Sequence, residues 1–181
     1  DALGNFWFGT YGEGLVKYGA DGFELFTTNH GLGDNYIWSF FPEKDGSLYI
    51  GTEEGLTIYK DNVFHNLNSN DGLLDPSVWA IKKDVYGNFW ILTDVSLTWY
   101  NKKEFKNYPT SDFFGANVLY IIDTFNINHL VLGTEKGLNK VTYTKNGELT
   151  SIKNFGRAEG FLGIECNANA ISLDKNGVFW I

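Results

Sequence analysis

The histidines are the side chains best suited to acid–base chemistry near neutral pH, because the imidazole titrates in that range. His30, His65 and His129 stand at unrelated places along the chain. A catalytic site needs an acid, a base or a nucleophile that converge, and no Ser or Cys of this sequence lies in a nucleophile elbow. We therefore expect surface or turn roles for the histidines, and we predict no catalytic residues and no enzymatic activity.

Two acidic stretches were tested against known cation sites, and neither fits. The run Asn66–Gly72 approaches a calcium loop, but its glycine comes one place late and the closing glutamate is missing. Glu53 and Glu54 are neighbours in a bend, and adjacent residues of a strand point to opposite faces, so we expect a solvated loop there. No spacing fits a zinc site. The sequence predicts neither a metal nor a cofactor.

Aromatic and amide side chains suggest binding rather than catalysis. Trp38, Trp79, Tyr120 and Asn169 hold equivalent places, each at the start of a strand-like segment. Rings in such a column can line the mouth of a ligand site or pack between neighbouring sheets, and both interpretations stay open. Asn169 breaks the column, and a local departure from a pattern often marks a functional site.

Three more polar residues complete the candidate set. Glu165 and Asn167 lie beside Asn169, and Arg157 can hold an acidic sugar through a bidentate contact. The candidate ligand-binding residues are therefore Trp38, Trp79, Tyr120, Arg157, Glu165, Asn167 and Asn169.

A short aromatic motif recurs along the whole chain and must position these side chains. It occurs at Gly4–Thr10, Gly46–Thr52, Gly87–Thr93, Asn128–Thr134 and Gly177–Ile181. Its central position steps by 42, 41, 41 and 49 residues. Self-similarity at a nearly fixed period indicates a repeat protein.

Each repeat divides into four strand-sized pieces with alternation of period two. Turns such as Glu43–Gly46 supply a capping carboxylate and a glycine for positive φ. Four short antiparallel strands in every 41 or so residues predict an all-β fold, the β-propeller. We predict a single domain over 1–181, with repeats at approximately 1–42, 43–83, 84–124 and 125–173 and the start of a fifth at 174–181.

About four blades are present on this prediction. An open arc of blades leaves exposed apolar edges, which proteins avoid. We therefore expect a fragment of a larger propeller, or an arc that closes by pairing with another copy as a homodimer.

Propellers bind ligands at one end, and two sets of loops lie there. One set leads into the first strand of each blade, and the other joins the second strand to the third. The sets are 29–36, 69–77, 110–117 and 155–167, and 11–14, 53–55, 94–96 and 135–137. Their Asn, Asp, Glu and aromatic residues suit a carbohydrate, since amides and carboxylates bind hydroxyls and rings stack on sugars, but they also suit plain turns.

Charge and composition narrow the choice of partner. The net charge is −8, with 22 acidic and 14 basic residues and no basic run, which argues against nucleic acid and anionic membrane surfaces as partners. No stretch approaches the roughly 18 apolar residues of a membrane helix, so no direct membrane contact is expected. The single cysteine, Cys166, cannot form an internal disulfide.

The motif order resembles the two-component regulator propeller repeat. The elements are Gly4–Thr10, then Gly14–Tyr18 with its Gly-Leu-x-x-Tyr pattern, then Asp21–Phe23, and the Gly31-Leu32 loop before Ile37–Ser39. The run Glu159–Ala170 is similar to a motif near the end of the propeller region in the same sensors. The third and fourth repeats depart from the pattern, for example at Val95–Leu97 and Asn128.

The resemblance implies a periplasmic sensor region whose parent protein is membrane-anchored and carries a histidine kinase or another output domain. Many such sensors detect oligosaccharides. We expect an extracytoplasmic domain that binds a small molecule or oligosaccharide without transforming it. The alternatives are a protein-interaction scaffold, which needs a flat apolar face, and a propeller lyase or hydrolase, which needs a His-centred cluster.

Overall fold

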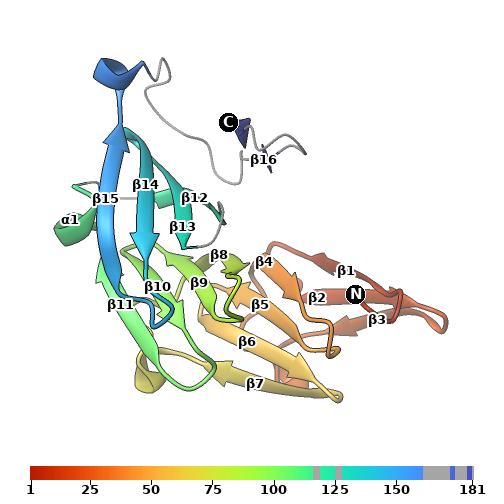
Figure 1. Ribbon diagram of the computed structural model, residues 1–181. Coiled ribbons are helices and arrows are strands. Elements are labelled where there is room, and N and C mark those ends of the chain that lie inside the picture. Colours follow the sequence, from red (N-terminus) through yellow and green to blue (C-terminus); the bar gives the residue numbers. More distant parts are fainter. Residues whose placement is uncertain (116–118, 125–127, 161–171, 174–178, 181) are drawn as a thin grey trace. The chain divides into compact units, whose positions relative to one another are not determined.

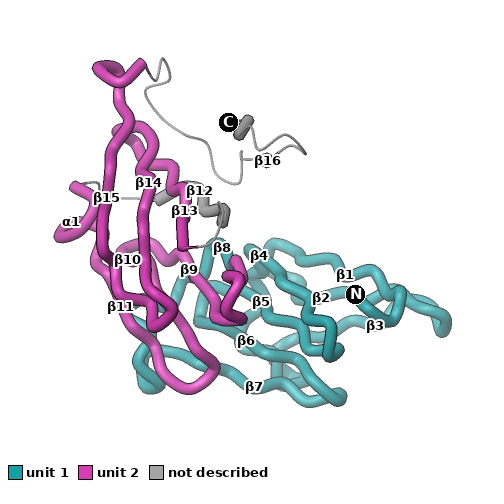
Figure 2. The backbone as a smooth tube through the Cα atoms, in the orientation of Figure 1, with its two compact units in different colours: residues 1–81 teal, residues 82–181 magenta. Residues whose placement is uncertain are grey.

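The computed structural model describes residues 1–115, 119–124, 128–160, 172–173 and 179–180. The chain divides into two compact units, residues 1–81 and 82–181 (Figure 2). Strands dominate both units (Figure 1). In the described part, no helix is long and apolar enough to cross a membrane.

Unit 1 contains two antiparallel sheets whose strands follow one another in chain order. The first sheet has the order β1-β2-β3 and the second β4-β5-β6-β7. The strands are β1 (Phe6–Gly9), β2 (Leu15–Gly19), β3 (Gly22–Phe26), β4 (Ile37–Pro42), β5 (Leu48–Thr52), β6 (Gly55–Lys60) and β7 (Val63–Leu67). Two 3₁₀ turns, η1 (Thr28–His30) and η2 (Ser69–Asp71), follow the last strand of each sheet.

The same meander continues in unit 2. Strand β8 (Val78–Lys83) spans the boundary between the units and completes the sheet order β11-β10-β9-β8. A further sheet has the order β12-β13-β14-β15, and β16 pairs with β17. The elements are β9 (Phe89–Thr93), β10 (Ser96–Tyr100), β11 (Phe105–Pro109), α1 (Thr110–Phe113), β12 (Leu119–Thr124), β13 (His129–Thr134), β14 (Gly137–Tyr143), β15 (Leu149–Phe155), η3 (Arg157–Glu159), β16 (Ser172–Leu173) and β17 (Phe179–Trp180).

The aromatic motif forms the second strand of a blade, as predicted. β5 and β9 are buried over their whole length, since each lies between two strands of its own sheet and under apolar side chains. A helix was not predicted in the loop 110–117, yet α1 forms directly after Pro109, where the Thr110 N–H donates to the Val95 carbonyl.

The core of unit 1 lies between its two sheets. Leu15 and Phe26 of the first sheet pack with Leu48, Ile50 and Tyr59 of the second. Burying such side chains is the main favourable term in folding, and neither small sheet offers enough area alone. The opposite face of the first sheet is apolar and exposed, and carries Phe6, Phe8, Tyr18, Phe23 and Leu25.

Candidate ligand-binding site

The antiparallel meander of unit 1 gathers its connections at two ends. The loop end comprises residues 10–14, 27–36, 53–54 and 68–77, which include the loops before β4 and β8. The turn end comprises residues 1–5, 19–22, 43–47 and 60–62, which are the tight turns. The two ends differ in what their side chains are engaged in.

Trp38 and Trp79 meet at the loop end. Each is the second residue of its strand, β4 and β8, so the repeat places them in equivalent positions. Their ring centroids are 4.4 Å apart with an interplanar angle of 34°, and both side chains are partly buried. The predicted column therefore holds for these two rings, while ligand binding by them stays a prediction.

Two tyrosines extend the pair into an aromatic row of Tyr36, Tyr11, Trp38 and Trp79. The Tyr11 ring lies 5.6 Å from Trp38 and 4.8 Å from Tyr36, edge-on to both. A β-bridge joins Tyr11 and Tyr36, and the Asn35 carbonyl accepts from the N–H groups of Gly12 and Gly14. Tyr11 is 77% exposed and Tyr36 39%, so the row presents ring surface to solvent.

Sequence analysis did not select these two tyrosines. Both fall within loops that it named, but the repeat gives neither an equivalent aromatic column. The bend that carries Tyr11 holds one residue more than the corresponding bend at 53–54. That extra residue is the signal in the sequence that points to this position.

Glu53 binds two residues of the row. The Trp38 Nε1–H donates to Glu53 Oε2 at 2.8 Å, and the Glu53 N–H donates to the Tyr36 carbonyl. The expectation that Glu53 belongs to a plain solvated loop is wrong, because its partly buried carboxylate fixes an indole. A charge-assisted hydrogen bond of this kind restricts the orientation of the ring.

A polar cavity also opens at the loop end. It has a volume of about 450 Å³ and is lined by Gly33, Glu54, Asn66, Asn68, Ser69, Asn70 and Pro76. Asn66 is committed to structure, since it donates to the Gly31 carbonyl and accepts from Thr57 Oγ1. Asn68 caps η2 by accepting from the Asn70 N–H. Glu54, Ser69 and Asn70 are exposed.

The other predicted residues come after residue 81 in the chain, outside unit 1. Arg157 is exposed in η3 of unit 2. Tyr120 falls in β12, and its side chain lies outside the described part. Glu165, Asn167 and Asn169 also lie outside the described residues. Their role in binding stays a prediction.

The histidines have local partners. His30 Nδ1 accepts from the Thr27 N–H at 3.0 Å and so caps η1 at the loop end. His65 is exposed on β7 opposite Ile58, and His129 begins β13. Within the described ranges, no group of three His, Cys, Asp or Glu side chains is placed to hold a metal ion.

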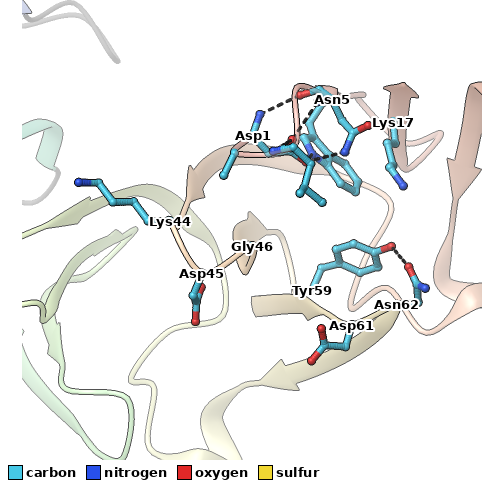
Figure 3. A pocket seen from close by; sticks show the side chains of 12 residues that line it. Asp1, Asn5, Lys17, Lys44, Asp45, Gly46, Tyr59, Asp61 and Asn62 are labelled. Carbon is cyan, nitrogen blue, oxygen red and sulfur yellow. Dashed lines mark hydrogen bonds between the residues drawn. The ribbon is translucent and has the colours of Figure 1, made fainter. Parts of the chain in front are cut away.

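A second cavity, of about 420 Å³, opens at the turn end (Figure 3). Its lining residues are Asp1, Ala2, Leu3, Asn5, Trp7, Lys17, Lys44, Asp45, Gly46, Tyr59, Asp61 and Asn62. Several of these are engaged in the fold. The Asp1 carboxylate accepts from the N–H groups of Leu3 and Asn5, from Asn5 Nδ2 and from Trp7 Nε1. The Tyr59 hydroxyl donates to Asn62 Oδ1 at 2.8 Å.

The turn end also carries an ion pair between hairpins. Lys60 Nζ lies 2.8 Å from Asp45 Oδ2. The hydrogen bond from Lys60, followed by that from the Ser47 N–H, holds the pKa of Asp45 well below its usual range, and the same pair raises the pKa of Lys60. Because its polar groups already pair with one another, this cavity is the weaker candidate for ligand binding.

Comparison with known proteins bears on the fold and the family. Residues 31–54 match the family model of the two component regulator propeller. The extracellular domain of the hybrid two component system BT3049 from B. thetaiotaomicron is 27% identical, with a TM-score of 0.81 over 99% of this chain and 25% of that chain. No curated protein sequence gives a significant match.

Two more distant structures share the fold. The extracellular domain of BT4673 from the same organism is 22% identical, with a TM-score of 0.75 over 98% of this chain and 25% of that one. Virginiamycin B lyase from Staphylococcus aureus is 12% identical, with a TM-score of 0.67 over 99% of this chain and 63% of the lyase. The chain spans a quarter of the length of the two extracellular domains. The chain has the predicted all-β fold of a propeller fragment, and residues 31–54 match the two-component regulator propeller repeat that its motifs resemble.

Proposed function

We propose that this chain forms part of the extracytoplasmic, ligand-sensing region of a two-component receptor and binds an oligosaccharide at the loop end of unit 1. The aromatic row carries the proposal. Tyr11, Trp38 and Trp79 present ring surface, and Glu53 fixes the indole of Trp38. Rings that stack on the apolar face of a sugar, with polar groups at their edge, suit carbohydrate recognition.

Similarity to the extracellular domains of hybrid two-component systems supports the sensing role and the periplasmic location. Sensing requires that the ligand bind two arrangements of the receptor with different affinity. A homodimer closed through the propeller arc offers one way to create two arrangements. The proposal assigns binding without chemistry, since His30, the histidine at this end, is engaged in capping η1.

A thermal-shift screen of the purified protein against an oligosaccharide library tests this function. A ligand at 100 times its dissociation constant stabilises a protein by about 2.7 kcal/mol, which is readily detected. The shift should disappear in the double variant Trp38→Ala, Trp79→Ala. Phe23→Ala is the matched control, because this 75% exposed ring lies on β3 outside the loop end.

Two results would overturn the proposal. One is the absence of any shift across neutral and acidic glycans. The other is a shift that survives unchanged in the double tryptophan variant, which would move the site elsewhere. In the first case, a scaffold that binds another protein becomes the better interpretation.

A further inference from the structure

The loop end of unit 1 carries acidic residues and no lysine or arginine. All of residues 1–81 are described, and the loop-end segments contain Glu13, Asp34, Glu53, Glu54, Asp71 and Asp75 but no Lys or Arg. The lysines of this unit are Lys17 on β2 and Lys44 and Lys60 at the turn end. The Asp and Glu side chains therefore give the loop end a negative electrostatic potential around the aromatic row.

Two of these carboxylates belong to Glu53 and Glu54, the two consecutive residues that join β5 to β6. Glu53 turns toward the row, where it accepts from the indole of Trp38. Glu54, the next residue, lines the polar cavity. Its N–H donates to Thr52 Oγ1, and the Thr52 hydroxyl donates to the Gly55 carbonyl at 2.9 Å. The backbone of the bend is thus held by its own hydrogen bonds. The Glu53 carboxylate binds the indole of Trp38, and the exposed Glu54 lines the cavity.

We propose that the loop end of unit 1 accepts uncharged oligosaccharides and excludes acidic ones, with Glu53 and Glu54 as the residues that determine this specificity. The inference rests on the proposed function and names the class of glycan bound there. Neutral sugar hydroxyls donate hydrogen bonds to carboxylates, whereas a uronate or sulfate brought beside Glu53 or Glu54 meets a like charge.

The residues that recognise acidic sugars are missing from this end. Carboxylates and sulfates are bound by Arg forks or by Lys, and residues 1–81 hold no Arg while their lysines lie away from the loop-end segments. Asp34 and Asp75 are engaged locally, as they accept from the N–H groups of Tyr36 and Ser77. Asp71 likewise accepts from the Asn68 N–H, whereas Glu53 contacts the row and Glu54 lines the cavity.

The test compares glycans that differ only in charge. Oligogalacturonates and their methyl esters share one ring skeleton, and sulfated oligosaccharides pair with their unsulfated forms. In a panel of such pairs, we expect the protein to bind only uncharged glycans tightly. In low salt, its affinity for the acidic glycan of a pair should be at least about tenfold weaker than its affinity for the neutral one. Raising the salt concentration should improve binding of the acidic member alone, because salt screens repulsion between charges.

The variants locate the cause of the selectivity. Glu53→Gln with Glu54→Gln should reduce the ratio of affinities severalfold, because acidic glycans gain affinity and neutral ones lose some, the amide oxygen being a weaker acceptor than a carboxylate. Asp21→Asn is the matched control, an exposed carboxylate removed at the turn end. An acidic glycan that binds best, and whose binding is lost in the double variant Trp38→Ala, Trp79→Ala, would overturn the inference and leave the proposed function standing. An unchanged ratio in the double glutamine variant would also overturn it. Failure of every glycan to bind would instead overturn the proposed function, and this inference with it.

Discussion

Trp7 and Trp38 each donate an indole N–H to a carboxylate, at opposite ends of unit 1. Trp7 Nε1 lies 2.7 Å from Asp1 Oδ2, and Trp38 Nε1 lies 2.8 Å from Glu53 Oε2. Asp1 also accepts from two backbone N–H groups, and the Trp7 ring packs against Phe26 and Tyr59 in the gap between the sheets. The bond of Trp38 instead holds a ring whose neighbours include the exposed Tyr11.

The same kind of hydrogen bond therefore holds a ring in the packed region between the sheets at the turn end, and orients a ring next to an exposed one at the loop end. What decides is the surroundings of the ring. At the turn end, the lysine of the neighbouring strand also covers Trp7, with Lys17 Nζ 5.8 Å from the ring centroid. No Lys or Arg occurs in the loop-end segments of residues 1–81, all of them described.

The largest expected effect is on stability at the turn end. Trp7→Ala should lower the free energy of unfolding by about 3 kcal/mol, the lower end of the range for buried aromatic rings, because the partly buried Trp7 ring packs against Phe26 and Tyr59. Trp38→Ala should cost less, because the Tyr11 ring beside Trp38 is exposed to solvent. Denaturant unfolding of both variants measures the difference, and equal losses would contradict the division between the two ends.

Substituting one glycine at each end compares how tightly the backbone is packed at the two ends. A Cβ on Gly14 would lie 2.2 Å from the Phe26 carbonyl oxygen, and the residue has φ +95°. Gly22, at the turn end, has φ +96° with open space around it. Gly22→Ala should cost about 1–2 kcal/mol from left-handed strain alone. Gly14→Ala adds a clash with backbone and should cost more.

Glycan binding is a second measurement for Gly14→Ala, because Gly14 lies in the same bend as Tyr11. The Gly14 N–H donates to the Asn35 carbonyl, which ties the bend to the loop before β4. Displacing the bend should therefore weaken glycan binding, while Gly22→Ala leaves it unchanged. Equal melting temperatures for the two variants would show that the close approach at Gly14 relaxes without cost.

Much of this fold follows from the repeat in the sequence. The period placed Trp38 and Trp79 in equivalent positions, and the predicted fourth strand at 63–67 is β7. Turn residues predicted the hairpins because glycine at positive φ is a local requirement, met for instance at Gly46 with φ +86°. Such features depend on neighbours in the chain, and a period reveals them.

The contacts that complete the site depend on tertiary structure. Tyr11 and Tyr36 meet across the gap between two sheets, and no local pattern connects them. The rule that neighbours on a strand point to opposite faces does not extend to a bend, so it could not place the Glu53 carboxylate beneath Trp38. Helix α1 has four residues, too few to show a helical period.

A smaller effect is expected from the bond between Trp38 and Glu53. Trp38→Phe keeps a ring against Trp79 but removes the indole N–H, which should lower the free energy of unfolding by about 0.5–1.5 kcal/mol. A double-mutant cycle with Glu53→Ala isolates the pair, since the two losses should not add. Additive losses would mean that the carboxylate and the indole act independently, and Glu53 would then have no part in orienting the row.

The smallest effect belongs to the ion pair between Lys60 and Asp45, which has no counterpart at the loop end of residues 1–81, where no Lys or Arg is found. Both side chains are largely exposed, so Lys60→Gln should lower the melting temperature by less than about 2 °C at pH 7.

The lowered pKa of Asp45 means that its ionised form stabilises the fold above about pH 4, and this contribution declines as the pH falls below that value. The raised pKa of Lys60 gives a contribution that is present below about pH 10 and lost as the pH rises through the folded-state value. The difference between the two proteins should therefore shrink between pH 7 and pH 3 in thermal melts. A difference that grows on acidification would mean that Lys60 stabilises the turn end through its aliphatic stem rather than through its charge.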